Sequence, residues 1–132
     1  LLTVSGLSFA DNYNNITRTL DVHELDSLRI EFPVGELEVE IWGGESLELD
    51  IELKSERSWL SWRRRKVDDI ELEVSTSGGE VFLGIDADKL NQHWVVKMPA
   101  KLALGVDLGV GEIRINGLKS NLAVELGVGE IE

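Results

Sequence analysis

The residues best suited to contact a ligand are concentrated in one short segment, residues 57–66, with the sequence RSWLSWRRRK. Indole rings favour the headgroup region of a membrane and guanidinium groups bind anionic phosphates, so this segment is a candidate lipid or glycan contact. The competing interpretation is a surface loop whose basic side chains are solvated and offset nearby acidic faces, as charge runs usually do. The candidate contact residues are Arg57, Trp59, Trp62, Arg63, Arg64, Arg65 and Lys66.

A glycine-rich phrase, LGVGEI, occurs twice, at residues 108–113 and 126–131. Phosphate-binding loops are also rich in glycine, but they need a following helix whose N-terminus holds the anion. Here an alternating strand pattern follows, and the glutamate of the phrase would repel a phosphate. Because glycine reaches the positive φ that a tight corner needs, we predict a structural role. The predicted structural corners are Gly35, Gly109, Gly111, Gly127 and Gly129.

The other chemically active residue types form no catalytic or metal-binding pattern. Carboxylates alternate along residues 36–40 and 48–52 and do not converge on one point, as a calcium site requires. His23 and His93 are far apart and each lacks a partner motif, while no serine lies in a nucleophile elbow. The sequence therefore predicts no cofactor, no metal and no enzymatic activity. One enzymatic alternative stays open, a β-helical carbohydrate-active enzyme, which needs paired carboxylates and aromatic platforms in a groove.

Composition and charge narrow the function classes further. The chain has 132 residues, of which 42% are hydrophobic, enough for one domain with its own core. Acidic residues outnumber basic ones by 25 to 13, which gives a net charge of −12. Nucleic-acid binding requires a basic surface, so this balance argues against it. The chain has no cysteine, which removes disulfides and thiolate ligands.

Apolar and polar residues alternate along most of the chain, as in residues 28–32, 36–42, 47–54 and 70–74. This period of two is typical of strands with one buried and one solvated face, and no segment has a convincing helical period. We therefore predict an all-β domain that begins with antiparallel strands and hairpins. One hairpin is expected across residues 42–45, where two glycines occur together. The segment 57–66 is expected at the tip of another.

The last third of the chain has a different pattern. From Leu102, short strands of four or five residues alternate with glycine corners, and a turn is expected at Gly109–Gly111. The pattern recurs 18 residues later, which is typical of a stacked, solenoid-like β-coil. In such a stack Glu112 and Glu130 would lie about 5 Å apart. The predicted fold is thus an all-β domain whose hairpins lead into a short stacked β-coil with glycine corners.

The two ends of the sequence also carry information. Residues 1–10, LLTVSGLSFA, have no charge and end with small residues at the positions that signal peptidase recognises. We interpret them as the tail of a signal peptide, so that residues 11–132 form a single domain outside the cytoplasm, in the periplasm or at the cell surface of a bacterium. No stretch reaches the ~18 apolar residues of a transmembrane span. Glu132 interrupts the second copy of the repeat, which predicts a truncated C-terminus and an open strand edge.

Four stretches carry a resemblance to a known family: GELEVEIW, DDIELEV, VKMPAKLALGVDLGVGEIRINGL and VELGVGEIE. In these the chain resembles the bacterial "putative adhesin" family of β-repeat domains, also called toastrack domains. The resemblance covers most of the sequence, from about residue 28 to the end. It implies an exported or membrane-tethered all-β domain of the kind found in envelope proteins and envelope-stress systems. The family has no catalytic residues to transfer to this chain.

These observations lead to one expected function and its alternatives. We expect a non-enzymatic, exported interaction or scaffold domain of the cell envelope, adhesin-like or related to envelope stress. Its expected partner is an envelope protein, a lipid or a glycan, and not a nucleic acid. The alternative is a lipid- or glycan-contacting module that uses residues 57–66. The sequence indicates neither the ligand nor the oligomeric state.

Overall fold

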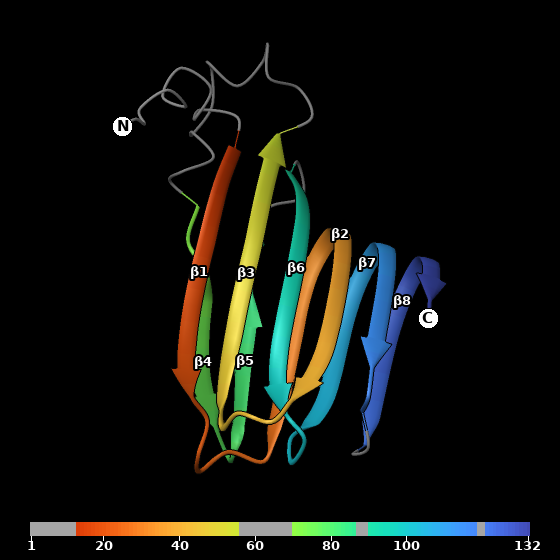
Figure 1. Ribbon diagram of the computed structural model, residues 1–132. Helices are drawn as coiled ribbons and strands as arrows, with labels where there is room; N and C mark the ends of the chain where they lie inside the picture. The colour runs from red at the N-terminus through yellow and green to blue at the C-terminus, as the bar shows by residue number, and fades with distance from the viewer. Residues whose placement is uncertain (1–12, 56–69, 87–89, 119–120) are drawn as a thin grey trace.

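The computed structural model describes residues 13–55, 70–86, 90–118 and 121–132, and these residues form eight strands and no helix (Figure 1). No helix among them is therefore available to cross a membrane. The predicted contact residues in segment 57–66 lie outside the described residues, as do residues 1–10. The strands are β1 (Tyr13–Asp21), β2 (Ser27–Trp42), β3 (Ser46–Ser55), β4 (Glu73–Ser77), β5 (Glu80–Gly84), β6 (Leu90–Pro99), β7 (Ala103–Asn116) and β8 (Leu122–Ile131).

One mixed sheet contains all eight strands, and it curls into a half-barrel because β2, β7 and β8 are bent (Figure 1). Residues 27–31 of β2 pair in parallel with β5, whereas residues 35–42 pair in parallel with β6. The two halves of β2 therefore belong to two different limbs of the sheet. Strands β4 and β5 extend the first limb, and strands β6, β3 and β1 extend the second. On its other side β2 is paired along most of its length with β7, and β7 is paired with β8.

The bend is encoded in the spacing of the apolar residues. Within each half of β2 the buried side chains are two residues apart, but Phe32 and Leu37 are five apart and both are buried. Residues on one face of a straight strand are separated by even numbers, so an odd interval moves the buried row to the opposite face. Because the chain folds over at Pro33–Gly35, that opposite face again points inward. The same interval separates Leu108 from Ile113 in β7, and both of those side chains are buried too.

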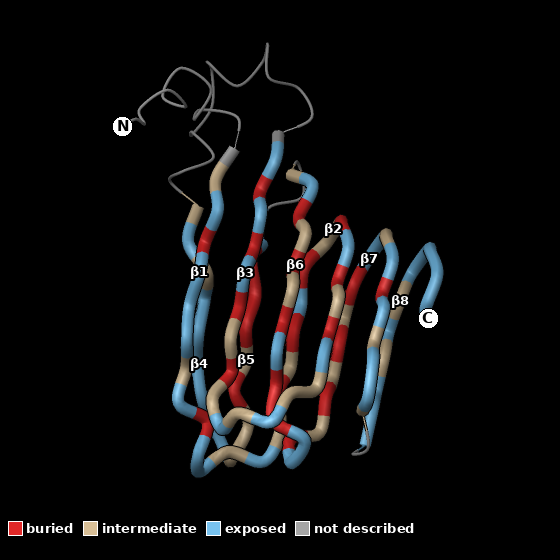
Figure 2. Tube along the Cα trace, in the orientation of Figure 1, coloured by how far each residue is buried: buried red, intermediate tan, exposed pale blue. Residues whose placement is uncertain are grey.

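The hydrophobic core fills the space between the two limbs, as the buried segments in Figure 2 indicate. The ring of Phe32 from the first limb stacks on Trp94 of β6, with centroids 5.1 Å apart and planes inclined by 6°. Both polar side-chain atoms of the buried Gln92 are hydrogen-bonded. Its Nε2 donates to the Ile85 carbonyl at 3.1 Å, and its Oε1 accepts from Trp94 Nε1 at 2.9 Å. A satisfied polar group at this depth fixes the register of β6 without the cost of an unpaired amide.

Three details of the predicted arrangement are wrong. The glycines 109 and 111 do not separate two short strands, because β7 continues through them as one strand of 14 residues. The hairpin across residues 42–45 does not form, since β6 lies between β2 and β3 in the sheet. Strands β3 and β4 do not pair either, so the segment that joins them does not connect a hairpin. The prediction of an all-β fold is confirmed, with parallel and antiparallel pairs in one sheet.

Candidate functional site

The first candidate site is a groove on the outer face of the first limb, next to the bend. Its volume is about 360 Å³, and its lining includes Glu31, Pro33, Glu73, Phe82, Asp86 and Asp107. Strand pairing places Glu73 opposite Gly84, Gly84 opposite Glu31, and Glu31 opposite Asp107. The groove is hollow at Gly84 because glycine has no side chain. The ring of Phe82 lies beside this position, about 3.0 Å from where a Cβ of residue 84 would be.

The groove favours a cationic group over other ligands. Four acidic residues and Phe82 are among its lining residues, and both carboxylates and aromatic faces attract ammonium or guanidinium groups. A glycosidase would instead need one carboxyl group kept protonated by an apolar environment beside a second that stays ionised. Both Glu31 and Glu73 are exposed to solvent. The groove thus lacks the buried acid of the enzymatic alternative.

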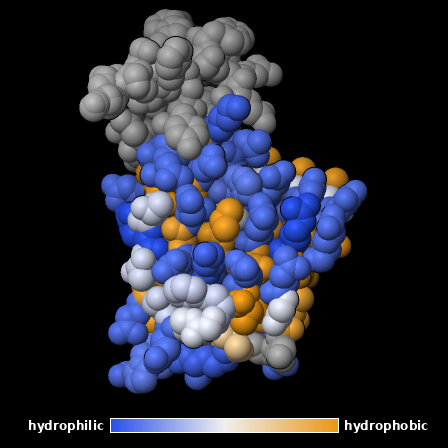
Figure 3. All heavy atoms as spheres, viewed as in Figure 1, coloured by the Kyte–Doolittle hydropathy of each residue, from blue (hydrophilic) through white to orange (hydrophobic). Residues whose placement is uncertain are grey.

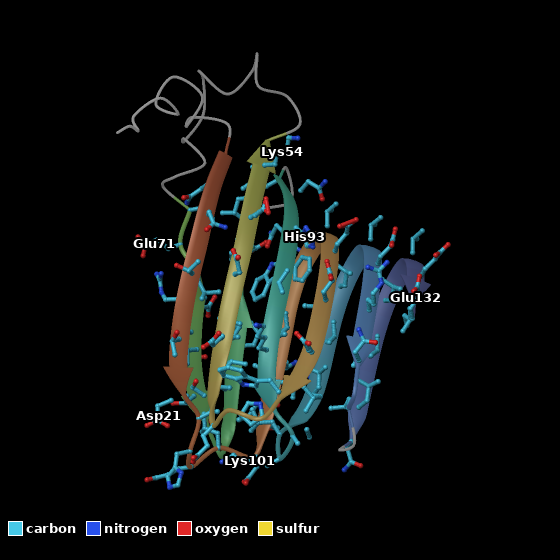
Figure 4. All side chains as sticks on the ribbon, viewed as in Figure 1. Asp21, Lys54, Glu71, His93, Lys101 and Glu132 are labelled. Atoms are coloured by element: carbon cyan, nitrogen blue, oxygen red, sulfur yellow. The ribbon has the colours of Figure 1, made fainter. Side chains whose placement is uncertain are left out.

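The second candidate is a histidine–glutamate group on the outer face of the other limb, beside the bend (Figure 4). The Nε2 atom of His93 lies 2.7 Å from Oε2 of Glu38, and its Nδ1 atom lies 3.8 Å from Oε1 of Glu36. No partner of His93 could be recognised from the sequence, because its two glutamates are more than 50 positions away. They approach it through the parallel pairing of β6 with β2. His23 lies apart from this group, near Lys101, whose ammonium donates to the His23 carbonyl at 2.5 Å.

The His93–Glu38 hydrogen bond lies at the partly exposed surface of the sheet. The imidazole is 38% exposed and the Glu38 side chain 42%. Among the residues that the structure describes, no group of three or more histidine, aspartate or glutamate side chains is placed to hold a metal ion. The residues 13–55, 70–86, 90–118 and 121–132 thus contain no metal cluster that would give His93 a ligand role.

The third candidate is the stack formed by the three bent strands, which brings all five predicted glycine corners together. Residues Gly35, Gly111 and Gly129 are in register on β2, β7 and β8, and their φ angles are 145°, 150° and 146°. A Cβ atom at Gly111 would collide with the Gly35 carbonyl oxygen, and one at Gly129 with that of Gly111. Gly109 and Gly127 make the same close approach to the carbonyls of Pro33 and Gly109. Glycine at these corners lets the strands stack.

In-register stacking also aligns the outward-facing carboxylates into two acidic columns. The first column is Glu36–Glu112–Glu130, directly after the bend, and the second is Glu31–Asp107–Glu125, before it. Neighbouring strands are about 4.8 Å apart, so like charges within a column repel one another. The first column continues at one end to His93, which is paired in register with Glu36. No ion pair found among the described residues involves Glu112 or Glu130.

The outer edge of this stack is formed by β8, and it differs from the remainder of the sheet. Within the described parts of the chain β8 pairs only with β7, and Figure 2 shows no buried segment along it. Its apolar side chains Leu122, Val128 and Ile131 are 46%, 67% and 53% exposed. Figure 3 shows apolar side chains along the margin formed by β7 and β8, whereas most of the face in view is hydrophilic.

Comparison with known proteins gives a fold relationship and no sequence family. No protein-family model matches the chain, and no curated protein matches its sequence. Among solved structures, a putative cell adhesion protein from Clostridium sporogenes superposes with a TM-score of 0.58 at 16% identity, over 89% of this chain and 58% of that chain. A putative adhesin from Bacteroides fragilis superposes with a TM-score of 0.55 at 21% identity, over 90% of this chain and 52% of that chain.

The chain shares the fold of these two proteins. The resemblance to the adhesin family that the sequence motifs indicate is thereby confirmed at the level of the fold. The chain spans a little over half the length of the two solved structures. A putative lipid binding protein from Parabacteroides distasonis also aligns, at 11% identity and a TM-score of 0.36, and at that score it supports no inference about the fold.

Proposed function

We propose that this chain is a non-enzymatic, adhesin-like interaction module of a bacterial cell envelope. The observation that carries the proposal is the fold it shares with a putative cell adhesion protein and a putative adhesin. The distribution of its surface groups supports the same function. Its exposed carboxylates, its His93–Glu38 pair and its exposed aliphatic side chains lie on open outer faces and on a strand edge, which are surfaces suited to a macromolecular partner.

Export to the envelope is part of the same proposal. It rests on residues 1–10, which have the composition of the end of a signal peptide. Residues 11–132 then function as one domain in the periplasm or at the cell surface. A role in adhesion, in scaffolding or in sensing of envelope stress is compatible with an open binding surface of this kind.

The finer architecture that we propose is a short β-coil, in which β2, β7 and β8 are successive turns. The bent strands repeat the same corner, they stack in parallel, and their apolar rows are continuous. Each turn packs part of its apolar row against the next turn, as in solenoid proteins. This arrangement gives the module one end that is closed by β5 and β6 and one end formed by β8.

The test is a binding assay with purified chain and envelope fractions. We expect saturable binding to membranes or cell-wall material from bacteria, and no binding to DNA or RNA because of the net charge of −12. An unrelated acidic all-β domain of similar size serves as the control. Binding no stronger than that of the control domain would contradict the proposal.

The tryptophan–arginine segment 57–66 is the second candidate contact, for a lipid or a glycan. A triple variant in which Arg63, Arg64 and Arg65 are changed to glutamine separates this candidate from contacts made by the sheet. If the segment is the contact, the variant loses binding to anionic liposomes or lipopolysaccharide while its melting temperature is unchanged. Binding that is unchanged in the variant would remove the segment from the proposal. A variant with Lys54, Lys97 and Lys101 changed to glutamine is the matched control, since it removes the same number of charges elsewhere.

A further inference from the structure

A second groove lies on the outer face of the other limb, across β1, β3 and β6, and we call it the β1–β3–β6 groove. Its volume is about 400 Å³, within the range of roughly 300–1,000 Å³ that small-molecule sites have. Strand β3 is paired with β1 and β6, and β6 is paired with β3 and β2, so the floor of the groove is interior sheet. Figure 3 shows this face, where a few apolar side chains are visible among hydrophilic ones.

The side chains that line this groove are mixed in charge and in hydrogen-bonding character. Strand register arranges them in two rows, which are Thr19–Glu48–Lys97 and Thr17–Asp50–Val95. Arg18 joins them from β1, where its Nη1 donates to the Thr17 carbonyl at 3.2 Å. The groove thus combines two hydroxyls, two carboxylates and two basic groups around a partly buried valine.

The charged groups of the groove do not pair with one another. Among the described residues no ion pair involves Arg18, Glu48, Asp50 or Lys97, although Glu48 and Lys97 are register partners. The Oδ1 atom of Asp50 accepts a hydrogen bond from Asn15 Nδ2 at 2.7 Å. A carboxylate has about four acceptor positions, so Asp50 keeps others for a ligand.

An indole ring borders the groove at its Lys97 end, because the Lys97 ammonium lies 5.9 Å from the centroid of the Trp42 ring. The ring is fixed in place. Its Nε1 donates to the Ser46 carbonyl at 2.9 Å, and it lies against Gly44, where a Cβ would be 2.5 Å from the ring. The ring is also partly exposed, and a fixed aromatic side chain loses little conformational entropy when a ligand packs on it.

The balance of charges disfavours most classes of ligand. An anionic ligand would face the carboxylates of Glu48 and Asp50, and a cationic ligand would face Arg18 and Lys97. A protein anchor or an acyl chain needs a well-packed apolar pocket, whereas Val95 supplies only a small apolar patch. Sugar hydroxyls both donate and accept hydrogen bonds, so they match carboxylates and basic groups that lie side by side.

We propose that the β1–β3–β6 groove binds a short, uncharged glycan. Sugar hydroxyls donate to the carboxylates of Glu48 and Asp50 and accept from the Lys97 ammonium and the Thr19 hydroxyl, while the apolar face of one sugar ring packs against Trp42. This deepens the proposed function, on which it rests, because it identifies the class of ligand and the surface that contacts it.

The probes are four neutral oligosaccharides, chitohexaose, cellohexaose, maltohexaose and mannohexaose, with a heparin hexasaccharide and hexagalacturonate as charged comparisons. Isothermal titration calorimetry with the full 132-residue chain measures their binding. We expect saturable binding of at least one neutral probe and weaker binding of both charged probes. Binding of none of the neutral probes, or tighter binding of a charged one, would overturn the proposal.

Ionic strength tests whether the ligand is recognised as an uncharged molecule. The affinity for the neutral probe should change by less than ~2-fold between about 0.01 M and about 1 M salt, over which the screening length falls from about 30 Å to about 3 Å. An affinity that falls steeply with salt would contradict recognition of a neutral glycan.

Matched variants test the contacts. The change Glu48→Ala should weaken binding at least ~10-fold, because it removes a hydrogen bond to a charged group, and Thr19→Val should weaken it several-fold. The controls Glu125→Ala on β8 and Thr76→Val on β4 make the same changes on exposed strand positions outside the groove, and they should leave the affinity unchanged. Equal affinities of all four variants would overturn the proposed contacts.

Nuclear magnetic resonance locates the site without any change to the protein, so it does not depend on how the variants fold. On addition of the neutral probe, the Val95 methyl groups and the Trp42 indole N–H should shift, while the Phe82 ring in the groove of the first limb should not. Shifts confined to the surroundings of Phe82 would overturn the proposal.

Three combined outcomes separate this proposal from the proposed function. If no neutral probe binds but the chain still binds envelope fractions, the glycan proposal fails and the proposed function stands. If a neutral probe binds and envelope fractions do not, the groove is a glycan site and the envelope function fails. If neither binds, both fail.

Discussion

The same six residues, LGVGEI, occur in β7 and in β8, yet the two copies have different environments. The isoleucine of the first copy, Ile113, is 1% exposed, whereas that of the second, Ile131, is 53% exposed. Their backbone geometry is nearly the same, since Gly111 and Gly129 both have φ near 150°. Burial is thus determined by neighbouring strands, because β7 is covered by β2 and β8 on its two sides, whereas among the described residues β8 pairs with β7 alone.

The largest difference between the two copies is expected at the corner glycines. The change Gly111→Val should destabilise the protein by about 4 kcal/mol or prevent folding, because the added Cβ overlaps the Gly35 carbonyl and the φ is unfavourable for valine. The change Gly129→Val introduces the same overlap with Gly111, but β8 can separate from β7 without opening the core. We expect its cost to stay near 1–2 kcal/mol. Thermal unfolding followed by circular dichroism measures both, and equal melting temperatures would show that the β8 corner is as essential as that of β7.

The isoleucines give the next largest difference. The change Ile113→Ala leaves a cavity in the core and should cost about 3 kcal/mol. The change Ile131→Ala removes a side chain that is already half exposed, and it should cost less than about 0.5 kcal/mol. Urea unfolding curves provide the comparison. A cost above 1 kcal/mol for Ile131→Ala, with an unchanged denaturant slope, would indicate that Ile131 is buried in solution.

Lysine substitutions at the glutamates of the two copies should change the stability less than the isoleucine substitutions do. They should stabilise the protein instead of destabilising it. Glu112 has acidic neighbours on both sides, Glu36 and Glu130, whereas Glu130 has one. The change Glu112→Lys should therefore stabilise the protein by roughly 0.5 kcal/mol and Glu130→Lys by roughly half of that. Melting temperatures at low and high salt test this, since the gain should decrease as salt screens the charges. A gain that does not respond to salt would point to a cause other than the column.

The smallest effect is expected at the ion pair that links the two strands after the corner. Arg114 Nε lies 3.5 Å from Glu132 Oε1, and both side chains are about half exposed. The change Arg114→Gln should cost less than about 0.2 kcal/mol, as is usual for solvated pairs. A double-mutant cycle with Glu132→Gln isolates the pair. A coupling energy above 1 kcal/mol would show that this contact holds β8 on β7.

The sequence predicted the positions of several strands correctly, but it did not predict which strands pair with one another. Alternation at residues 28–32, 36–42 and 47–54 correctly indicated strands with one buried face. The predicted hairpin across residues 42–45 failed because β6, which begins 45 residues later, inserts between the two strands. A period of two is a local property, and it specifies which face of a strand is buried without specifying which strand lies beside it.

The candidate sites also differ in whether their residues are close together in the sequence or are brought together by strand pairing. The glycines of β7 and β8 are visible in the repeat, because each copy carries its own two glycines. The carboxylate groove was not identified from the sequence, since Glu31, Glu73 and Asp107 come from three strands that are distant in sequence. The glutamate partners of His93 were not identified either, because they are also distant from it in sequence. One available signal was the five-residue interval between Phe32 and Leu37, which locates the bend and with it the line along which the carboxylate columns form.

The sequence by itself determined that this protein is an acidic, all-β domain with repeated glycines. The alternation of apolar and polar residues, the net charge and the glycine spacing are all properties that can be read directly from the order of the residues. Only the tertiary structure decided that β6 lies between β2 and β3, and that the Glu112–Glu130 pair extends to Glu36 and His93. The physical reason is that the backbone N–H and C=O groups of a strand form their hydrogen bonds with other strands and not within the strand. Its partners are therefore selected by the packing of the whole sheet and not by the strand's own residues.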